Sequence, residues 1–373
     1  MLKDLFKNYI YPVATLTGSI IGVGFLSLPY ITLKVGIFTM LFYFITLTAL
    51  VLFVHLIFGQ ICLKTPDFKR WPGFVGFYLG KTAKKIILVS MIFGSFGILL
   101  AYLLIGGRFL WAIISPFLGG DILNYILIYF ILASIFVYFG VRAISKFDLF
   151  ALTSLILVLF LIVIKGFSKI SLGNIFTTNS FGDWKTVFLP YGAIIFSLWG
   201  AGFIPEVEEM VQGNKKLLKK IITTSILLAA VFYILFIFLI LGISGNQTTD
   251  SALLGLKNLG QWIYPLALSI GLITTFIAFI ANGLLLKKVF MYDMGFKEFP
   301  SWILTCFTPL VLFFLGFNSF IPLISFIGAV FLGIDGILIL LIYKKIGGRK
   351  IIIYPLVLFF ILGIVYSIVY FVK

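Results

Sequence analysis

Residues 17–29 read Thr-Gly-Ser-Ile-Ile-Gly-Val-Gly-Phe-Leu-Ser-Leu-Pro, and residues 190–206 read Pro-Tyr-Gly-Ala-Ile-Ile-Phe-Ser-Leu-Trp-Gly-Ala-Gly-Phe-Ile-Pro-Glu. Each stretch lies inside an apolar run and carries a Gly-x-Gly, at 22–24 or 200–202, shortly before a proline. Glycine weakens a helix and proline removes one of its hydrogen bonds, so we expect both runs to unwind locally. Close packing of helices through small residues is the alternative for either stretch taken alone.

The composition around these stretches is typical of a membrane-embedded bundle. Of the 373 residues, 62% are hydrophobic and only 11% are charged, whereas a soluble domain carries about 25% charged residues. Eleven apolar runs approach the roughly 20 residues that a transmembrane helix needs, and little chain is left for a soluble domain. The runs are 9–31, 36–62, 86–115, 122–140, 148–165, 187–210, 220–243, 260–286, 299–316, 320–343 and 351–372.

The basic residues predict the orientation, because Lys and Arg concentrate in cytoplasmic loops. If the N-terminus is cytoplasmic, 21 of the 28 basic residues lie on the cytoplasmic side. The other seven are Lys34, Arg108, Lys165, Lys169, Lys185, Lys257 and Lys373. With an odd number of spans, the C-terminus is then external. We expect a multi-pass protein of the cell membrane, plasma or inner, and read the net charge of +16 as loop charge and not as a nucleic-acid surface.

The two interrupted runs are the first and the sixth, so their helices cross the membrane in opposite directions. Interrupted helices at matching places in two inverted halves are typical of a transporter site near the middle of the membrane. An unwound turn exposes N–H groups that suit a carboxylate. It also exposes carbonyl groups that suit an ammonium or a metal cation. An α-amino acid carries both a carboxylate and an ammonium group.

The sequence also resembles a known family. Residues 18–30, G-S-I-I-G-V-G-F-L-S-L-P-Y, and residues 190–210 resemble the first and sixth helices of the amino acid/auxin permease family. Residues 99–107, 274–279 and 307–317 are similar to stretches of its bacterial tyrosine and tryptophan permeases. The resemblance implies an all-α integral membrane protein of the leucine-transporter type, a 5+5 inverted repeat with about eleven transmembrane helices, and symport of a substrate with an ion.

The expected organisation follows from that fold. Residues 1–165 form the first five-helix repeat and 166–186 an extracellular loop. Residues 187–343 form the second, inverted repeat, and 344–373 an eleventh transmembrane helix.

The resemblance also implies the residues that bind the substrate. The carboxylate side would be lined by Ser19, Ile20, Gly22 and Gly24. Carbonyl groups for the amino group would come from Phe196, Ser197, Leu198 and Gly200. Trp199 lies in the second break and either touches the substrate or packs on a neighbour. Tyr102, in the middle of the third run, needs a partner for its hydroxyl, and the substrate carboxylate is a candidate.

Two kinds of ion-coupling residue are candidates. Thr274 and Thr275, with carbonyl groups of Gly18, Ile21 and Gly271, resemble the sodium site of this fold, although such threonines also bond their own helix. Glu206 and Asp335 are ionisable residues inside apolar runs, where carboxyl groups are functional suspects. Glu206 is expected either to be buried and carry a proton or to form a salt bridge at an inner gate, and Asp335 is either a gate residue or a proton site. The expected coupling ion is H⁺, with Na⁺ as the alternative; His55 is expected to be a hydrogen-bonded structural residue.

Other functions fit less well. One histidine and two cysteines give no zinc site, and no cofactor or metal is expected. The sequence shows no catalytic cluster for a membrane enzyme and no filter-like repeat for a channel. An amino-acid sensor, or a transporter of another amine-bearing solute, would use the same fold and stays open. The expected partners are an amino acid, aromatic or otherwise neutral, and membrane lipid.

Overall fold

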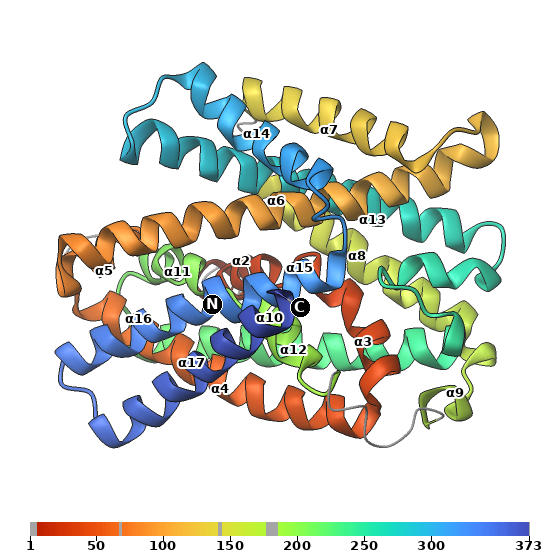
Figure 1. Cartoon of the computed structure of the whole chain (residues 1–373). Coiled ribbons are helices and arrows are strands. Elements are labelled where there is room, and N and C mark those ends of the chain that lie inside the picture. Colours follow the sequence, from red (N-terminus) through yellow and green to blue (C-terminus); the bar gives the residue numbers. More distant parts are fainter. Residues whose placement is uncertain (1–5, 67–68, 141–143, 177–185, 373) are drawn as a thin grey trace.

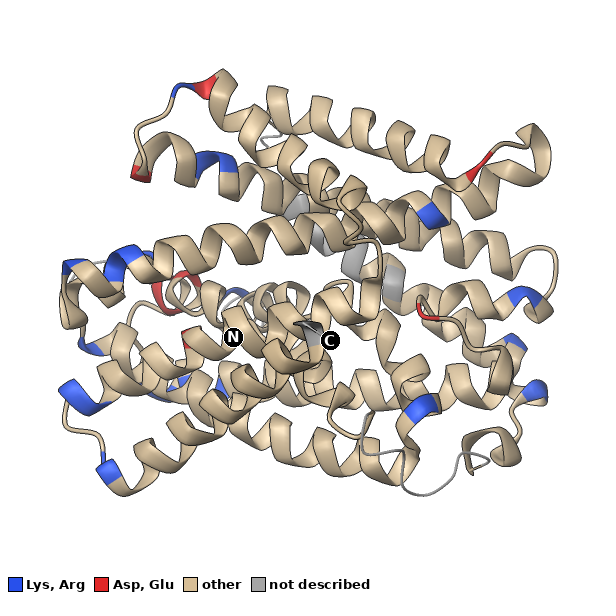
Figure 2. Ribbon diagram, in the orientation of Figure 1, with Lys and Arg blue, Asp and Glu red and all other residues tan. Residues whose placement is uncertain are grey.

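The structure is a computed structural model that describes residues 6–66, 69–140, 144–176 and 186–372. It is a bundle of long helices with short connections (Figure 1), and the described residues contain no β-strand. Lys and Arg lie mostly at the two ends of the bundle, and the helix segments between them are nearly free of charge (Figure 2). This distribution is what a bilayer around the middle of the bundle requires.

The first apolar run is broken as expected. α2 (Tyr11–Ile20) ends before residues 21–23, which are not helical, and a 3₁₀ turn (Gly24–Ser27) leads into α3 (Leu28–Val35). The two parts of the helix meet at a bend of 51°. Pro29 lies in the first turn of α3, where its missing N–H group costs no helix hydrogen bond.

The sixth run is broken in the same way. α10 (Leu189–Leu198) ends at Trp199, whose backbone is extended (φ −80°, ψ 117°). Gly200 and a 3₁₀ turn (Ala201–Phe203) then lead into α11 (Ile204–Met210). Pro190 and Pro205 lie in the first turns of α10 and α11. The local unwinding predicted at both Gly-x-Gly stretches is therefore present.

The other apolar runs coincide with helices, several of which extend beyond the run. α6 begins five residues before its apolar run because charged residues continue a helix into the headgroup region. α15 passes through a π-helical turn, Ile327–Phe331, into α16. The helices are α4 (Ile37–Lys64), α6 (Lys81–Leu118), α7 (Ile122–Phe139), α8 (Ile144–Gly166), α12 (Lys215–Ser244), α13 (Ile263–Lys288), α14 (Glu298–Phe314), α15 (Phe320–Phe326), α16 (Leu332–Lys345) and α17 (Lys350–Val372).

Within the described residues, seven helices are long and apolar enough to cross a membrane, and the bent pair at 6–35 would make eight. α14 is apolar but shorter than this criterion, and α10 and α11 are separated by the break. The count of eleven crossings stays a prediction.

Short helices occupy loops that carry no helix signal in the sequence. They are α5 (Trp71–Leu79), α9 (Leu172–Phe176) and a 3₁₀ helix at Leu253–Leu259. α5 lies at the end of the bundle that also holds α11 and the end of α16 (Figure 1). Part of the predicted loop 166–186 lies outside the described residues.

Close backbone contact holds the first half of the sixth helix against the tenth. A Cβ atom on Gly192 of α10 would lie 2.0 Å from the carbonyl oxygen of Ser325. A Cβ atom on Gly328 would lie 1.9 Å from the carbonyl oxygen of Gly192. Only glycine fits at these two positions, and the contact fixes where the second break lies relative to α15 and α16.

Candidate functional site

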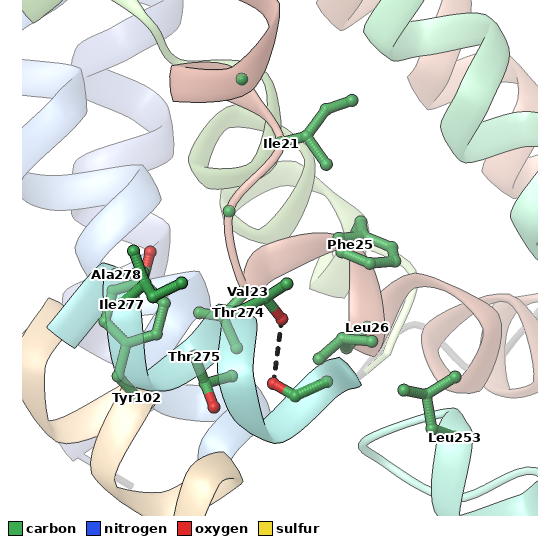
Figure 3. Close-up of a pocket in the computed structure, with 13 residues that line it drawn as sticks. Ile21, Val23, Phe25, Leu26, Tyr102, Leu253, Thr274, Thr275, Ile277 and Ala278 are labelled. Atoms are coloured by element: carbon green, nitrogen blue, oxygen red, sulfur yellow. Dashed lines mark hydrogen bonds between the residues drawn. The ribbon is translucent and has the colours of Figure 1, made fainter. Parts of the chain in front are cut away.

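A cavity of about 80 Å³ lies beside the break in the first helix. Its walls come from Gly18, from residues 21–23 and 25–26, from α6, from α13 and from Leu253 (Figure 3). One water molecule needs about 10–15 Å³ of such space, so the cavity holds several waters or one end of a small solute. It lies among helices that the sequence had assigned to the site.

The cavity brings together seven of the predicted site residues. They are Gly18, Ile21, Gly22, Tyr102, Gly271, Thr274 and Thr275. Tyr102 is 7% exposed, and its hydroxyl oxygen lies 3.2 Å from the place that a Cβ atom on Gly22 would take. The tyrosine therefore faces the unwound turn directly, as the prediction for the carboxylate end of the substrate requires.

The two threonines already use their hydroxyl hydrogens. Thr274 donates a 2.9 Å hydrogen bond to the carbonyl of Gly271 (Figure 3), and Thr275 donates one of 2.9 Å to the carbonyl of Leu272. Both threonines thus bond the backbone of their own helix, which was the alternative to a sodium site. Because a hydroxyl oxygen keeps its lone pairs when it donates, the two oxygens can still face a cation. Ion binding by this set stays a prediction.

The predicted residues of the sixth helix do not line this cavity. A Cβ atom on Gly24 would lie 2.6 Å from both the Phe196 ring and the Ser197 hydroxyl, and one on Gly200 would lie 2.5 Å from the side chain of Ile20. The two breaks are therefore packed against each other. Ser19 also lies outside the cavity, and its hydroxyl donates to the carbonyl of Leu16 at 2.8 Å.

His55 of α4 holds the break in the sixth helix. Its Nε2 atom accepts a 2.9 Å hydrogen bond from the backbone N–H of Gly200. Its Nδ1 atom therefore carries the hydrogen, which it donates to the carbonyl of Val51 at 2.8 Å. The side chain is fully buried, and the Trp199 ring packs edge-on against it at 5.1 Å. The expected structural role is present, and it serves the break itself.

Tyr233 of α12 joins the two breaks and was not singled out from the sequence. Its fully buried hydroxyl lies 2.8 Å from the carbonyl oxygen of Ser197 and 3.0 Å from that of Ile20. The Ile20 carbonyl also accepts from the N–H of Gly22 at 2.8 Å. The single hydroxyl hydrogen of Tyr233 goes to one of the two carbonyl groups or is shared between them, so Tyr233 links the ends of α2 and α10. A tyrosine in the middle of an apolar run was the available signal, because its hydroxyl needs a partner there.

Asp335 of α16 contacts residues near the break in the sixth helix. The indole N–H of Trp71 in α5 donates a 2.9 Å hydrogen bond to its part-buried carboxyl group. The Trp199 indole also interacts with this carboxyl, although it forms no hydrogen bond of good geometry. Asp335 therefore connects α16, the loop helix α5 and the residue at which α10 ends. The role of Trp71 could not be anticipated, because its loop gave no helix signal.

The expected burial of Glu206 is wrong. Its side chain is exposed, as is that of Glu209, and Glu208 is half-buried. Glu206 lies in the first turn of α11. At the other end of the bundle, Arg108 pairs with Asp250 at 2.5 Å, as the expected outer position of Arg108 permits. Clusters of three or more potential metal-binding His, Cys, Asp or Glu side chains are absent from the described ranges.

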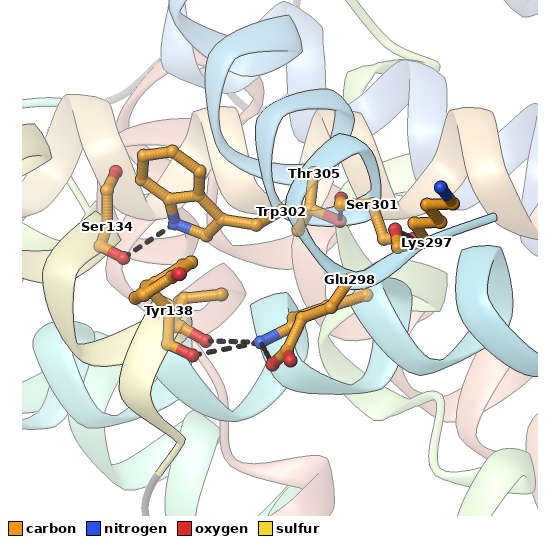
Figure 4. A network of polar contacts seen from close by, with 9 residues as sticks. Ser134, Tyr138, Lys297, Glu298, Ser301, Trp302 and Thr305 are labelled. Atoms are coloured by element: carbon orange, nitrogen blue, oxygen red, sulfur yellow. Dashed lines mark hydrogen bonds and ion pairs between the residues drawn. The ribbon is translucent and has the colours of Figure 1, made fainter.

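A separate polar network joins α7, α13 and α14 (Figure 4). The ammonium group of Lys287 pairs with Glu298 at 2.8 Å and donates to the carbonyl groups of Tyr138 at 2.9 Å and Val137 at 3.4 Å. Its side chain is only 6% exposed. The Trp302 indole donates to the carbonyl of Ser134 at 2.9 Å. Lys287, which the sequence assigned to a charged loop, is a buried link between three helices.

Comparison with known proteins supports this architecture. The model of the family described as "transmembrane amino acid transporter protein" matches residues 8–372. No curated protein sequence matches the chain with significance.

Solved structures share the fold at low sequence identity. MhsT, solved in complex with L-phenylalanine, superposes with a TM-score of 0.67 at 16% identity, covering 97% of this chain and 98% of that one. Mhp1, a nucleobase-cation-symport-1 family transporter, superposes in an inward-facing form with a TM-score of 0.63 at 14% identity, covering 90% and 76%. Its closed form, with bromovinylhydantoin bound, gives 0.59 at 15% identity, covering 88% and 76%.

These structures are transporters of the leucine-transporter fold. The predicted fold class is therefore confirmed, and the apolar helices mark a multi-pass membrane protein. The match over nearly the whole chain shows that this protein belongs to the transmembrane amino acid transporter family.

Proposed function

We propose that the protein is a proton-coupled symporter of a neutral α-amino acid, with aromatic amino acids as the first candidates. The substrate would bind at the unwound centres of the first and sixth helices. The observation that carries the proposal is the cavity beside residues 21–23, which Tyr102 closes from α6. MhsT, which shares the fold, was solved with L-phenylalanine, and this supports aromatic substrates.

The two ends of the substrate would enter different parts of the site. The carboxylate would meet the N–H groups around Gly22 and Gly24 and the Tyr102 hydroxyl, because free N–H groups at a helix start favour an anion. The ammonium group would need carbonyl groups of α10. The carbonyl of Ser197 is engaged by Tyr233, and that of Gly200 accepts from Phe203 at 3.1 Å. The ammonium group would therefore share or replace these donors at the end of α10.

Asp335 is the better candidate for the proton, since Glu206 is exposed. A carboxyl group surrounded by protein tends to stay neutral and can release its proton when water reaches it. Asp335 interacts with Trp199 at the break, so a movement of α10 relative to α11 would change its surroundings. The alternative is Na⁺ at Thr274 and Thr275, which lie with three backbone positions of the predicted ion site in one cavity.

Uptake into proteoliposomes tests the function and separates the ions. We expect labelled tyrosine or tryptophan to exchange by counterflow, and an inward pH gradient to drive accumulation without Na⁺. Asp335→Asn should keep exchange and lose accumulation, while Glu206→Gln keeps both. A requirement for Na⁺ that disappears in Thr274→Val/Thr275→Val would overturn the proton assignment. Substrate binding without any flux would instead identify a sensor, and flux of only non-amino-acid amines would exclude the proposed substrate.

We also propose a cytoplasmic N-terminus and an external C-terminus in the cell membrane. Single cysteines in place of Lys216 and Lys257, in a chain without Cys62 and Cys306, would report the orientation. An impermeant maleimide should label the Lys257 position from outside and the Lys216 position only after lysis. Labelling of both from one side would contradict this topology.

A further inference from the structure

A second cavity lies between α4 and α12 with Tyr343 of α16 at its edge, and it shares no lining residue with the cavity beside the first break. Its volume is about 410 Å³. We call it the basic groove. α4 and α12 touch at Gly59, where a Cβ atom would lie 2.8 Å from the side chain of Ile222. Lys64 at the end of α4 bonds the carbonyl of Ile346 beyond the end of α16, so the groove lies where the ends of these three helices gather.

The groove changes from apolar to basic along its length. Phe53, Leu56 and Ile57 line one part of it, on α4. Lys215 and Lys219, one helical turn apart on α12, line the other part. Both lysines are exposed and lie in the first turns of α12, where the helix dipole also favours an anion. The groove thus fits a ligand with a negative head and an apolar tail.

These two lysines have no internal counter-charge. In the described ranges, no carboxylate lies within ion-pair distance of Lys215 or Lys219, and no acidic residue lines the groove. Two neighbouring lysines do have partners. Lys220 lies over the Tyr9 ring at 4.7 Å, and Lys344 lies over the Tyr354 ring at 5.1 Å. Lys215 and Lys219 are therefore the basic residues that line the groove and lack an acidic partner there, which suits an anion at this place.

The apolar part of the groove continues a lipid-facing stripe of α4. Phe42 and Ile45 are 64% and 70% exposed, which in a membrane helix means contact with acyl chains. Phe53 and Leu56 follow about three turns later on the same face. An acyl chain can therefore run from this stripe into the groove without leaving hydrocarbon.

We propose that the basic groove binds an anionic phospholipid, with its phosphate between Lys215 and Lys219 and one acyl chain along Phe53, Leu56 and Ile57. The predicted orientation places this lipid in the cytoplasmic leaflet, whose anionic lipids attract basic residues beside membrane helices. The site is independent of the amino acid site, so it stands or falls separately from the proposed transport function.

Native mass spectrometry of the detergent-purified full chain tests the proposal with phosphatidylglycerol and phosphatidylcholine. The variant is Lys215→Gln/Lys219→Gln. The matched control is Lys216→Gln/Lys220→Gln, which removes the same charge from the same turns outside the groove. We expect a preference for phosphatidylglycerol that falls about five-fold per lysine, roughly 25-fold for the pair, in the variant. The control should keep the preference, and size-exclusion profiles would show that both variants are folded.

Three outcomes would overturn the proposal. If variant and control lost the preference for phosphatidylglycerol equally, general surface charge and not the groove would attract the lipid. Equal retention of the two lipids by the unaltered protein would show no headgroup recognition. Competition by glycerol phosphate at the strength of the whole lipid would show a phosphate site without a role for the acyl chain.

Discussion

The backbone N–H of Gly200 donates a 2.9 Å hydrogen bond to Nε2 of His55, a residue 145 positions earlier in the chain. The bond satisfies an amide that the break in the sixth helix would otherwise leave unpaired in a buried place. An unsatisfied buried amide costs about 1–3 kcal/mol. The geometry of the break therefore depends on an acceptor that comes from another helix.

Replacing His55 tests this dependence. We expect His55→Leu to lower transport strongly, because Gly200 loses its acceptor. His55→Gln should retain more transport and a higher melting temperature, since an amide oxygen can accept the same bond. Initial uptake rates and thermal unfolding of the purified variants would measure both effects. Equal behaviour of the leucine and glutamine variants would reduce His55 to a space-filling residue.

Tyr233→Phe removes a hydroxyl that bonds carbonyl groups at both breaks. We expect a loss of about 1–2 kcal/mol of stability and a lower substrate affinity, because the two broken helices lose their shared donor. Tyr191→Phe is the control, since the buried Tyr191 hydroxyl has no hydrogen-bond partner in the described ranges. Isothermal titration with the transported amino acid gives the affinities. The hydroxyl of Tyr233 would be unimportant if both variants bound substrate like the unaltered protein.

Gly200 and Gly202 provide a matched pair for the packing of the breaks. A Cβ atom on Gly200 would lie 2.5 Å from the buried Ile20 side chain, whereas one on Gly202 would meet nothing within 4 Å. We expect Gly200→Ala to insert into the membrane but to transport poorly, with about 1–3 kcal/mol of overpacking. Gly202→Ala should transport normally. Ile20→Ala combined with Gly200→Ala should recover activity. If this double variant stays inactive and Gly202→Ala also transports poorly, the effect comes from lost backbone flexibility and not from packing.

Lys287 and Lys288 are neighbours with opposite surroundings. Lys287→Met should lower stability by about 1.5–3 kcal/mol, the range for hydrogen bonds to charged groups, because two carbonyl groups and Glu298 lose their donor. Lys288 is exposed, so Lys288→Met should change stability by about 0.5 kcal/mol or less. Thermal unfolding in detergent compares the two. Similar melting temperatures would show that the network of Figure 4 contributes little.

The sequence predicted the parts of the molecule that follow from local rules. Gly-x-Gly and proline placed both breaks, and apolar length placed the helices, because these features act on their own segment. The helix ends were less accurate, since charged residues such as Lys81 and Lys215 begin a helix several positions before its apolar run starts. Short helices such as α5 were missed, because they are too short to show a period.

The contacts around the breaks could not be predicted in the same way. The acceptor for Gly200 comes from His55, the donor for Ser197 from Tyr233, and the donor for Asp335 from Trp71. Each pair depends on the tertiary arrangement. The prediction that Glu206 is buried failed for a similar reason. Its burial was inferred from its position along the apolar run, but the exposure of its side chain depends on how the short α11 is oriented.

His55 and Tyr233 lie on α4 and α12, the helices that follow the broken helix in each predicted repeat, and these two helices pack against each other. His55 of the first repeat bonds the break of the second, and Tyr233 of the second reaches Ile20 in the break of the first. The two halves are thus linked by reciprocal hydrogen bonds through α4 and α12. A rocking motion of one half away from the other would stretch both hydrogen bonds together. Opening on either side of the membrane must therefore move the broken helices together with α4 and α12, or break the two bonds in one coupled step.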